Sequence, residues 1–275
     1  MNLDFLSLEK EILFSWFEGL VTRSIQKLEG NPLGNGKLDY YKQEFFKQYC
    51  IHFLSIRTLA PGLKLIYKSR ENEISALAPV SVLLRAALEN FSMFHYIYMD
   101  SVDSQETHFR FWSWFREGLM YRQRLKIKHS PEKLKEEKQE IDRILNEFQQ
   151  HRSFQLLTKK QKVKYRNEGT WCFLSMRELL DRAGFSKPLS NNCYNFFSSY
   201  THPTSSAQIQ TAQADFETSN EILRTMLKPL FICTALYLQD YSLMFKDVDN
   251  LLIEKDREFV GTWCEFGAEL MKEPT

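Results

Sequence analysis

The sequence LLRAALENFSMFHY, residues 83–96, has the spacing of a helix that is buried on most sides. Apolar side chains recur in it every three or four residues, which is the period of an α-helix. Four polar residues interrupt the apolar pattern at intervals of four, three and four, namely Arg85, Glu89, Ser92 and Tyr96. Residues at these intervals lie on one face of a helix. The stretch therefore predicts a core helix that carries one polar stripe.

The same period runs along nearly the whole chain and predicts an all-α fold. Glycine and proline number only 10 and 8 among 275 residues, which argues against β-sandwiches, barrels and Gly-rich phosphate loops. We expect a single helical domain, residues 1–275, built as a bundle of about seven to nine helices. Residues 204–213 are predicted to be a polar connector, and Gly184 a left-handed helix cap. The predicted helices cover residues 3–28, 40–60, 79–99, 104–128, 131–150, 171–182, 189–202, 216–245 and 254–271.

Charge is distributed unevenly along the chain, although the net charge is only +1. Residues 122–166 contain 14 Lys and Arg against 6 Asp and Glu, so this segment carries +8 and the other residues carry −7. We expect the segment to form a basic helical hairpin that is inserted in the domain and protrudes from it. Such a hairpin could bind phosphate backbones or an acidic partner. The alternative is a solvated face that pairs with the acidic body or with a second subunit, which is the usual role of a charge run.

A second polar stripe consists of Tyr194, Ser198 and His202, which are spaced by four residues. Pro203 follows directly, and it predicts that the helix ends at His202. A histidinium at a helix C-terminus is stabilised by the macrodipole, typically by about 0.3–1 kcal/mol. This position suits a general acid or a phosphate ligand.

The first stripe places a charge on an apolar helix, and a buried charge requires a partner. Glu89, one turn after Arg85, is the obvious partner. An arginine four residues before a glutamate is the weaker orientation for helix stability, worth about 0.2–0.5 kcal/mol. The pair is therefore either a structural ion pair or part of a functional site.

The two stripes together resemble an uncharacterised family of bacterial all-helical domains that is described as HEPN-like and found in defence and toxin contexts. The shared pattern is Arg-x-x-x-Glu on an apolar helix, followed much later by Tyr-x-x-x-Ser-x-x-x-His-Pro. The resemblance extends over about Tyr40 to Leu243, and the matching residues are Arg85, Glu89, Tyr194, Ser198, His202 and Pro203. It implies a HEPN-like bundle in which the two stripes face one another.

HEPN ribonucleases cut RNA without a metal ion. An arginine and a histidine stabilise the phosphate and transfer protons while the 2′-hydroxyl attacks the adjacent phosphorus. Their signature is an arginine followed, after about four to six residues, by a histidine, and it is absent at His202. The signature occurs instead at Arg124 and His129, with a second match from Arg122 to the same histidine. Because one such match is expected by chance, this pair is a secondary candidate.

These observations lead to the hypothesis of a HEPN-like bacterial conflict protein, a toxin or antiphage defence protein that binds RNA or cleaves it as a metal-independent endoribonuclease. The predicted catalytic residues are Arg85, Glu89 and His202. Tyr194 and Ser198 would orient the substrate. Whether the protein is an enzyme stays open, because a non-catalytic helical sensor or adaptor that dimerises and binds a protein partner would also use a buried polar network.

No cofactor and no metal are expected, because His-Glu-x-x-His, P-loop and dinucleotide-binding motifs are absent from the sequence. The expected partners are RNA, an antitoxin or defence-system subunit, and a second copy of the chain in a homodimer. No membrane association is expected, since the longest apolar stretch, residues 229–238, is about half of a transmembrane helix. Residues 1–9 lack a basic segment that would begin a signal peptide, and we expect a cytoplasmic protein.

Overall fold

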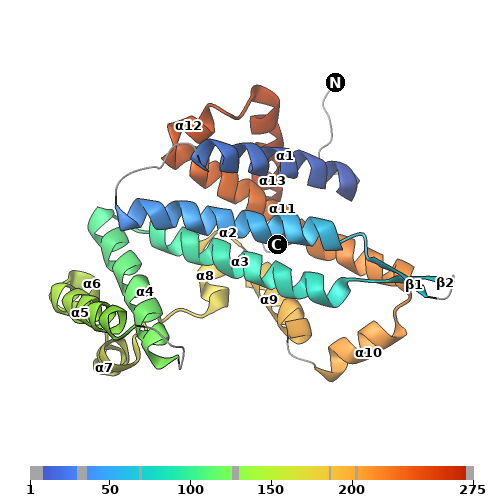
Figure 1. Ribbon diagram of the computed structural model, residues 1–275. Helices are drawn as coiled ribbons and strands as arrows, with labels where there is room; N and C mark the ends of the chain where they lie inside the picture. Colours follow the sequence, from blue (N-terminus) through green and yellow to red (C-terminus); the bar gives the residue numbers. More distant parts are fainter. Residues whose placement is uncertain are drawn as a thin grey trace. The chain divides into compact units, whose positions relative to one another are not determined.

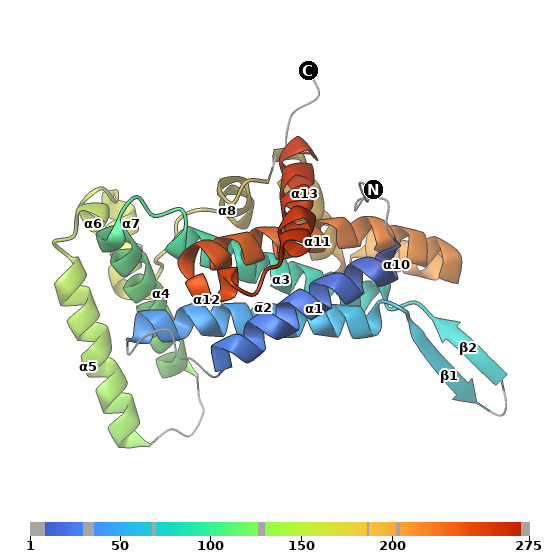
Figure 2. The ribbon, with the colours of Figure 1, turned by 90° about the horizontal axis from the view of Figure 1, so that it is seen from above.

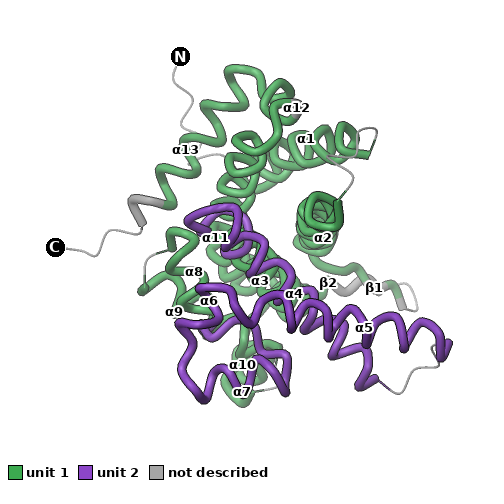
Figure 3. The backbone as a smooth tube through the Cα atoms, turned by 90° about the vertical axis from the view of Figure 1, so that its left-hand side faces the viewer, with its two compact units in different colours: residues 1–95, 176–275 green, residues 96–175 purple. Residues whose placement is uncertain are grey.

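The computed structural model of the protein describes residues 9–29, 36–67, 70–125, 130–185, 187–201 and 204–270. These residues are almost entirely helical (Figure 1), which confirms the predicted all-α class. They form more helices than the seven to nine predicted. The chain divides into two compact units (Figure 3): unit 1 consists of residues 1–95 and 176–275, and unit 2 of residues 96–175.

Unit 1 contains most of the long helices and a β-hairpin (Figures 1 and 2). In chain order its elements are α1 (Lys10–Glu29), α2 (Lys37–Leu59), β1 (Leu63–Tyr67), β2 (Arg70–Ile74), most of α3 (Leu77–Tyr98), α8 (Met176–Arg182), α9 (Lys187–Thr201), α10 (Ser205–Gln213), α11 (Phe216–Met244), α12 (Lys246–Asp249) and α13 (Glu254–Leu270).

The core of unit 1 is centred on α11, whose residues 230–235 are all buried. Three other helices place aromatic side chains against it. Phe17 of α1 stacks on Phe231 with ring centroids 5.5 Å apart, and Phe94 of α3 stacks on Tyr237 at 4.5 Å. From α2, the hydroxyl of Tyr49 lies 2.8 Å from Thr234 Oγ1. Aromatic pairs of this kind add to the stabilisation from apolar burial, so α1, α2 and α3 are held to one central helix.

Two elements of unit 1 differ from the sequence-based expectation. β1 and β2 form an antiparallel hairpin that begins after Gly62, whose φ of +88° is one that glycine adopts without strain. Residues 204–213 were predicted to be a connector, and this prediction is wrong, because they contain α10. The helix begins where Thr204 Oγ1 accepts a hydrogen bond from the backbone N–H of Ala207, which is an N-cap. Gly184 has a φ of +96°, which confirms the predicted left-handed cap.

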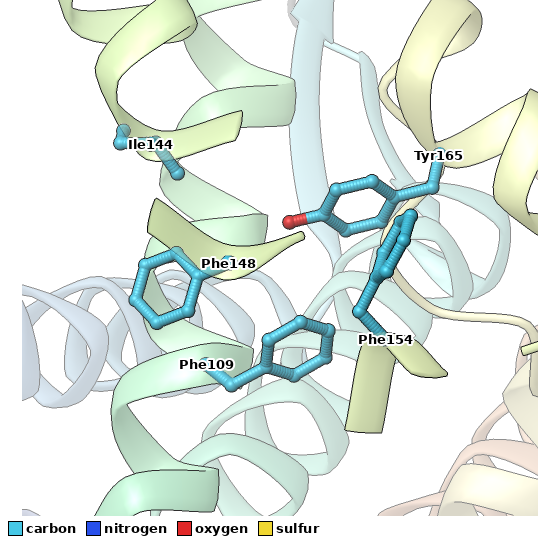
Figure 4. Close-up of a cluster of buried hydrophobic side chains, with 5 residues drawn as sticks. All are labelled: Phe109, Ile144, Phe148, Phe154 and Tyr165. Atoms are coloured by element: carbon cyan, nitrogen blue, oxygen red, sulfur yellow. The ribbon is translucent and has the colours of Figure 1, made fainter. Parts of the chain in front are cut away.

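Unit 2 contains the end of α3 and the helices α4 (Ser104–Arg124), α5 (Pro131–Phe148), α6 (Arg152–Gln155) and α7 (Lys159–Glu168). Its core is mainly aromatic (Figure 4), and its buried members are Phe109, Ile144, Phe148, Phe154 and Tyr165. They come from α4, α5, α6 and α7, so each of these four helices contributes to one cluster. The basic segment predicted over residues 122–166 lies within unit 2.

α3 is long and apolar enough to cross a membrane, but half of its most apolar window is buried inside the protein. A core helix of a soluble protein has the same properties, because its apolar surface is covered by neighbouring helices. Among the residues that the structure describes, no other helix meets these criteria.

Candidate functional site

Arg85, Glu89 and Tyr194 meet in unit 1, where they join α3 to α9. The Nε of Arg85 donates to Glu89 Oε1 over 2.8 Å, and a terminal nitrogen of the same guanidinium donates to the hydroxyl of Tyr194 over 3.1 Å. The guanidinium carbon also lies 5.0 Å from the centroid of the Tyr194 ring, within cation–π range. The contact joins one residue from each polar stripe.

Arg85 keeps its charge in this setting and remains accessible. Desolvation lowers its pKa, but the hydrogen bond and charge of Glu89, with a smaller contribution from Tyr194, outweigh this effect and raise the pKa above its ordinary value. The side chain of Arg85 is 20 % exposed and that of Glu89 36 %. A guanidinium held by two neighbours at a partly open surface is preorganised to bind an anion.

Arg177 is a second arginine at this site, and the sequence reasoning missed it. This exposed residue of α8 places its guanidinium carbon 5.8 Å from the ring centroid of Tyr194 and donates to Asn195 Oδ1. Within the described part of the chain Arg177 makes no ion pair, so Glu89 is the carboxylate partner of one of the two arginines. The group therefore carries a surplus positive charge.

The other residues of the two stripes differ in how they are placed. The Oγ of Ser198 is buried and has no hydrogen-bond partner among the described residues. Ser92 is buried too, but its hydroxyl donates to the carbonyl of Leu88 within its own helix. His202, predicted to be the catalytic acid or base, lies outside the described residues, as does Pro203; α9 is described up to Thr201.

The secondary candidate Arg124 lies in unit 2, where it contacts the end of α7. It donates to the carbonyl of Glu168 over 2.7 Å, and Arg116, two turns earlier on α4, donates to the carbonyls of Tyr165 and Arg166. These carbonyls belong to the last turn of α7, which has no donors of its own for them. Arg124 thus stabilises a helix end, while its predicted partner His129 lies outside the described residues.

Basic side chains are exposed on two helices of unit 2. Arg122 and Arg143 pair with glutamates of α5, whereas six exposed lysines form no ion pair within the described residues. The unpaired lysines are Lys133, Lys135 and Lys138 on α5 and Lys159, Lys160 and Lys164 on α7. Unpaired, solvated lysines produce a positive potential that attracts polyanions.

A family model of known sequences matches residues 47–222, described as a family of unknown function, DUF5677. The chain belongs to the DUF5677 family. This confirms the predicted membership of an uncharacterised family. Comparisons with curated proteins and with solved structures give no match. The DUF5677 region contains all of unit 2 and all the residues named above from Arg85 to His202, so both the arginine pair and the lysines belong to it.

No group of three or more His, Cys, Asp and Glu side chains that could hold a metal ion is found within the described ranges of this DUF5677 protein. The cysteines among these ranges are all reduced. Burial raises the pKa of Cys193 and, with smaller contributions from two acidic neighbours, that of Cys264, in each case to about 12. Thiols with such pKa values are neutral near pH 7 and poor nucleophiles.

Proposed function

We propose that this DUF5677 protein binds RNA through the phosphate backbone and that Arg85 is its central phosphate contact. The observation that carries the proposal is the arrangement of Arg85 and Arg177 around Tyr194, with Glu89 as the carboxylate partner of Arg85 only. Two guanidinium groups present several N–H donors in fixed planes, which is the geometry that recognises phosphate oxygens.

The class of polyanion follows from a second feature. Unit 2, taken by itself, carries six exposed lysines on α5 and α7, and each is a further possible contact to a phosphate group. A mononucleotide would need only the arginine site, whereas a nucleic acid gains affinity from each contact between a basic side chain and a phosphate, through the release of counterions. RNA is preferred over DNA because its 2′-hydroxyl can serve as the internal nucleophile that the predicted chemistry requires.

The proposed reaction is a metal-independent cleavage of RNA. The 2′-oxygen forms a bond to the adjacent phosphorus, the bond from phosphorus to the 5′-oxygen breaks, and a cyclic phosphate and a 5′-hydroxyl end result. A base removes the 2′-proton, and an acid supplies a proton to the departing oxygen. Arg85 would stabilise the negative charge on the phosphate, Glu89 and Tyr194 would hold Arg85 in position, and His202 would be the proton-transferring group.

The wider setting of this activity is the one predicted from the sequence. The protein would be a HEPN-like conflict protein, either a toxin or an antiphage defence protein, that acts in the cytoplasm as a homodimer. An antitoxin or another defence-system subunit would be its protein partner. A HEPN-like arrangement of the helices and a defence role are part of the proposal.

RNA binding is tested by salt dependence. The logarithm of the affinity falls linearly with the logarithm of the salt concentration. Each lost phosphate contact should make this slope less steep by about one. We expect this for Arg85→Ala and for Arg177→Ala, with unchanged melting temperature for the exposed Arg177. Arg257→Ala is the control, because it removes another exposed arginine of unit 1, one that pairs with Asp249. If Arg85→Ala and Arg177→Ala keep the wild-type slope and affinity, RNA does not contact these residues.

Cleavage is tested separately with total RNA in the presence of EDTA. We expect wild-type protein to cut RNA, and His202→Ala and Arg85→Ala to be inactive while they melt at the same temperature as wild type. Glu89→Gln should retain RNA binding but cleave more slowly, because it leaves Arg85 less firmly held. Binding without cleavage by wild type would reduce the proposal to an RNA-binding protein.

The adaptor hypothesis remains the alternative, and one observation favours it: the Arg85–Glu89–Tyr194 network joins α3 to α9 and would fix the position of one helix against the other. It predicts that Arg85→Ala lowers the melting temperature by many degrees and that the wild-type protein does not bind RNA. Unchanged stability combined with loss of function would contradict it.

A further inference from the structure

Unit 1 contains a pocket that is distinct from the arginine site. It has a volume of about 530 Å³ and lies between α9, α10 and α11. Arg85, Glu89, Arg177 and Tyr194 do not line it. Pockets of about 300–1,000 Å³ are typical of small-molecule sites, so this one is large enough for a ligand of moderate size.

The walls of the pocket are apolar. They are formed mainly by the side chains of two helices, Leu189, Phe196 and Phe197 from α9 and Ile222, Met226 and Ile232 from α11. Cys193 also lines the pocket, and burial raises the pKa of its thiol to about 12, so the sulfur adds a neutral and weakly polar surface. A ligand that fills this space must therefore have an apolar body.

One charged residue lies among the lining residues. Lys228 is exposed, and no ion pair involves it in the described part of the chain. Asn192, from the opposite wall, is also exposed and supplies an amide that can donate a hydrogen bond. A single cation next to an apolar cavity favours a ligand with one anionic group at the end of an apolar body, because the charge stays at the solvated rim.

We propose that this pocket binds a small amphipathic carboxylate, such as a fatty acid, with its acyl chain between α9 and α11 and its carboxylate beside Lys228. An acyl chain satisfies the apolar walls through burial, which contributes about 0.8 kcal/mol for each methylene group removed from water. The carboxylate pairs with Lys228 and accepts a hydrogen bond from Asn192. The observations behind this site are not those behind the RNA-binding proposal, so either proposal can fail without the other.

The test uses the full-length protein and cis-parinaric acid, a fluorescent fatty acid. We expect its fluorescence to rise saturably at one site per chain and palmitate to displace it. Ile222→Trp fills the pocket and should weaken binding about tenfold or more, equivalent to at least 1.4 kcal/mol. The matched control is Ile209→Trp, which places the same bulk at a residue of α10 that is 54 % exposed and does not line the pocket. Equal affinity of the two tryptophan variants for the probe would show that the fatty acid does not bind in this pocket.

The role of the charge is tested with Lys228→Glu. We expect it to weaken palmitate binding about fivefold, as for an exposed ion pair, and to leave hexadecanol, which has no charge, unaffected. Arg224→Glu is the control, because this exposed residue precedes Lys228 by one turn and does not line the pocket. Equal effects on palmitate and hexadecanol would overturn the carboxylate assignment. If Ile222→Trp instead converts a dimer to a monomer without altering probe binding, the pocket is a subunit interface and the proposal is wrong.

Discussion

Asp240 of α11 should make the protein less stable as the pH rises. Its side chain is largely buried, its Oδ2 atom has no hydrogen-bond partner among the described residues, and burial raises its pKa from 3.8 to about 7. Between about pH 4 and 7 the unfolded chain releases this proton while the native protein keeps it, so the free energy of unfolding falls as the pH rises. Each unit of pKa difference is worth about 1.4 kcal/mol, which gives a total loss of about 4 kcal/mol.

Asp240→Asn removes the titration while keeping the size of the side chain. We expect the variant and the wild type to be about equally stable near pH 4, and the variant to be more stable by up to about 4 kcal/mol near pH 8. Urea unfolding curves across this range measure the difference directly.

Asp249→Asn is the control for the sign of this effect. This exposed carboxylate accepts a hydrogen bond from Arg257, which lowers its pKa. Its contribution to stability is therefore present above its unfolded pKa and lost as the pH falls. The wild type should gain stability relative to Asp249→Asn as the pH rises toward about 4, and the difference should then stay constant up to pH 8, where the wild type loses stability relative to Asp240→Asn. A stability difference between wild type and Asp240→Asn that does not change with pH would refute the argument from burial.

Four further substitutions test the packing. Arg116→Met should lower the free energy of unfolding by about 2–4 kcal/mol in urea, because it leaves the last carbonyls of α7 without donors; a neutral result would mean that water replaces the guanidinium. Gly169→Ala should lower the free energy of unfolding by about 1–2 kcal/mol, because the φ of Gly169 is +82°. Gly118→Ala should raise it by up to about 1 kcal/mol, because the added carbon meets open space and alanine favours the helix α4. Tyr49→Phe removes the hydrogen bond to Thr234, which should lower the free energy of unfolding by about 1 kcal/mol and with it the melting temperature. An unchanged melting temperature would contradict this.

The long helices were predictable from the sequence because their apolar faces repeat with the helical period. α3 and α11 begin and end within a few residues of the predictions, and Gly184 caps α8 as its position suggested. The same period placed Arg85 and Glu89 one turn apart, and the structure connects them by a hydrogen bond. These features depend on residues that are close together in the chain, so local spacing contains enough information.

The features that the sequence did not reveal depend on tertiary contacts or on weak local signals. Arg177 belongs to a short helix and approaches Tyr194 only because α8 and α9 pack together, so no spacing could have indicated it. The role of Arg124 at the end of α7 likewise depends on a contact between residues 44 positions apart. α10 was missed because its polar composition resembles a loop, although the Thr204 N-cap was a signal that could have been used.

The two proposed sites share α9, and this sharing has a thermodynamic consequence. Successive residues of an α-helix point about 100° apart, so Tyr194 faces Arg85 while its neighbour Cys193 lines the pocket. A fatty acid that shifts α9 would therefore change the distance between Tyr194 and Arg85, and with it the affinity for RNA. Linkage requires that RNA then change the affinity for the fatty acid by the same factor. Equal RNA affinities with and without bound cis-parinaric acid would instead show that packing against α8 and α10 holds α9 in place and keeps the two sites independent.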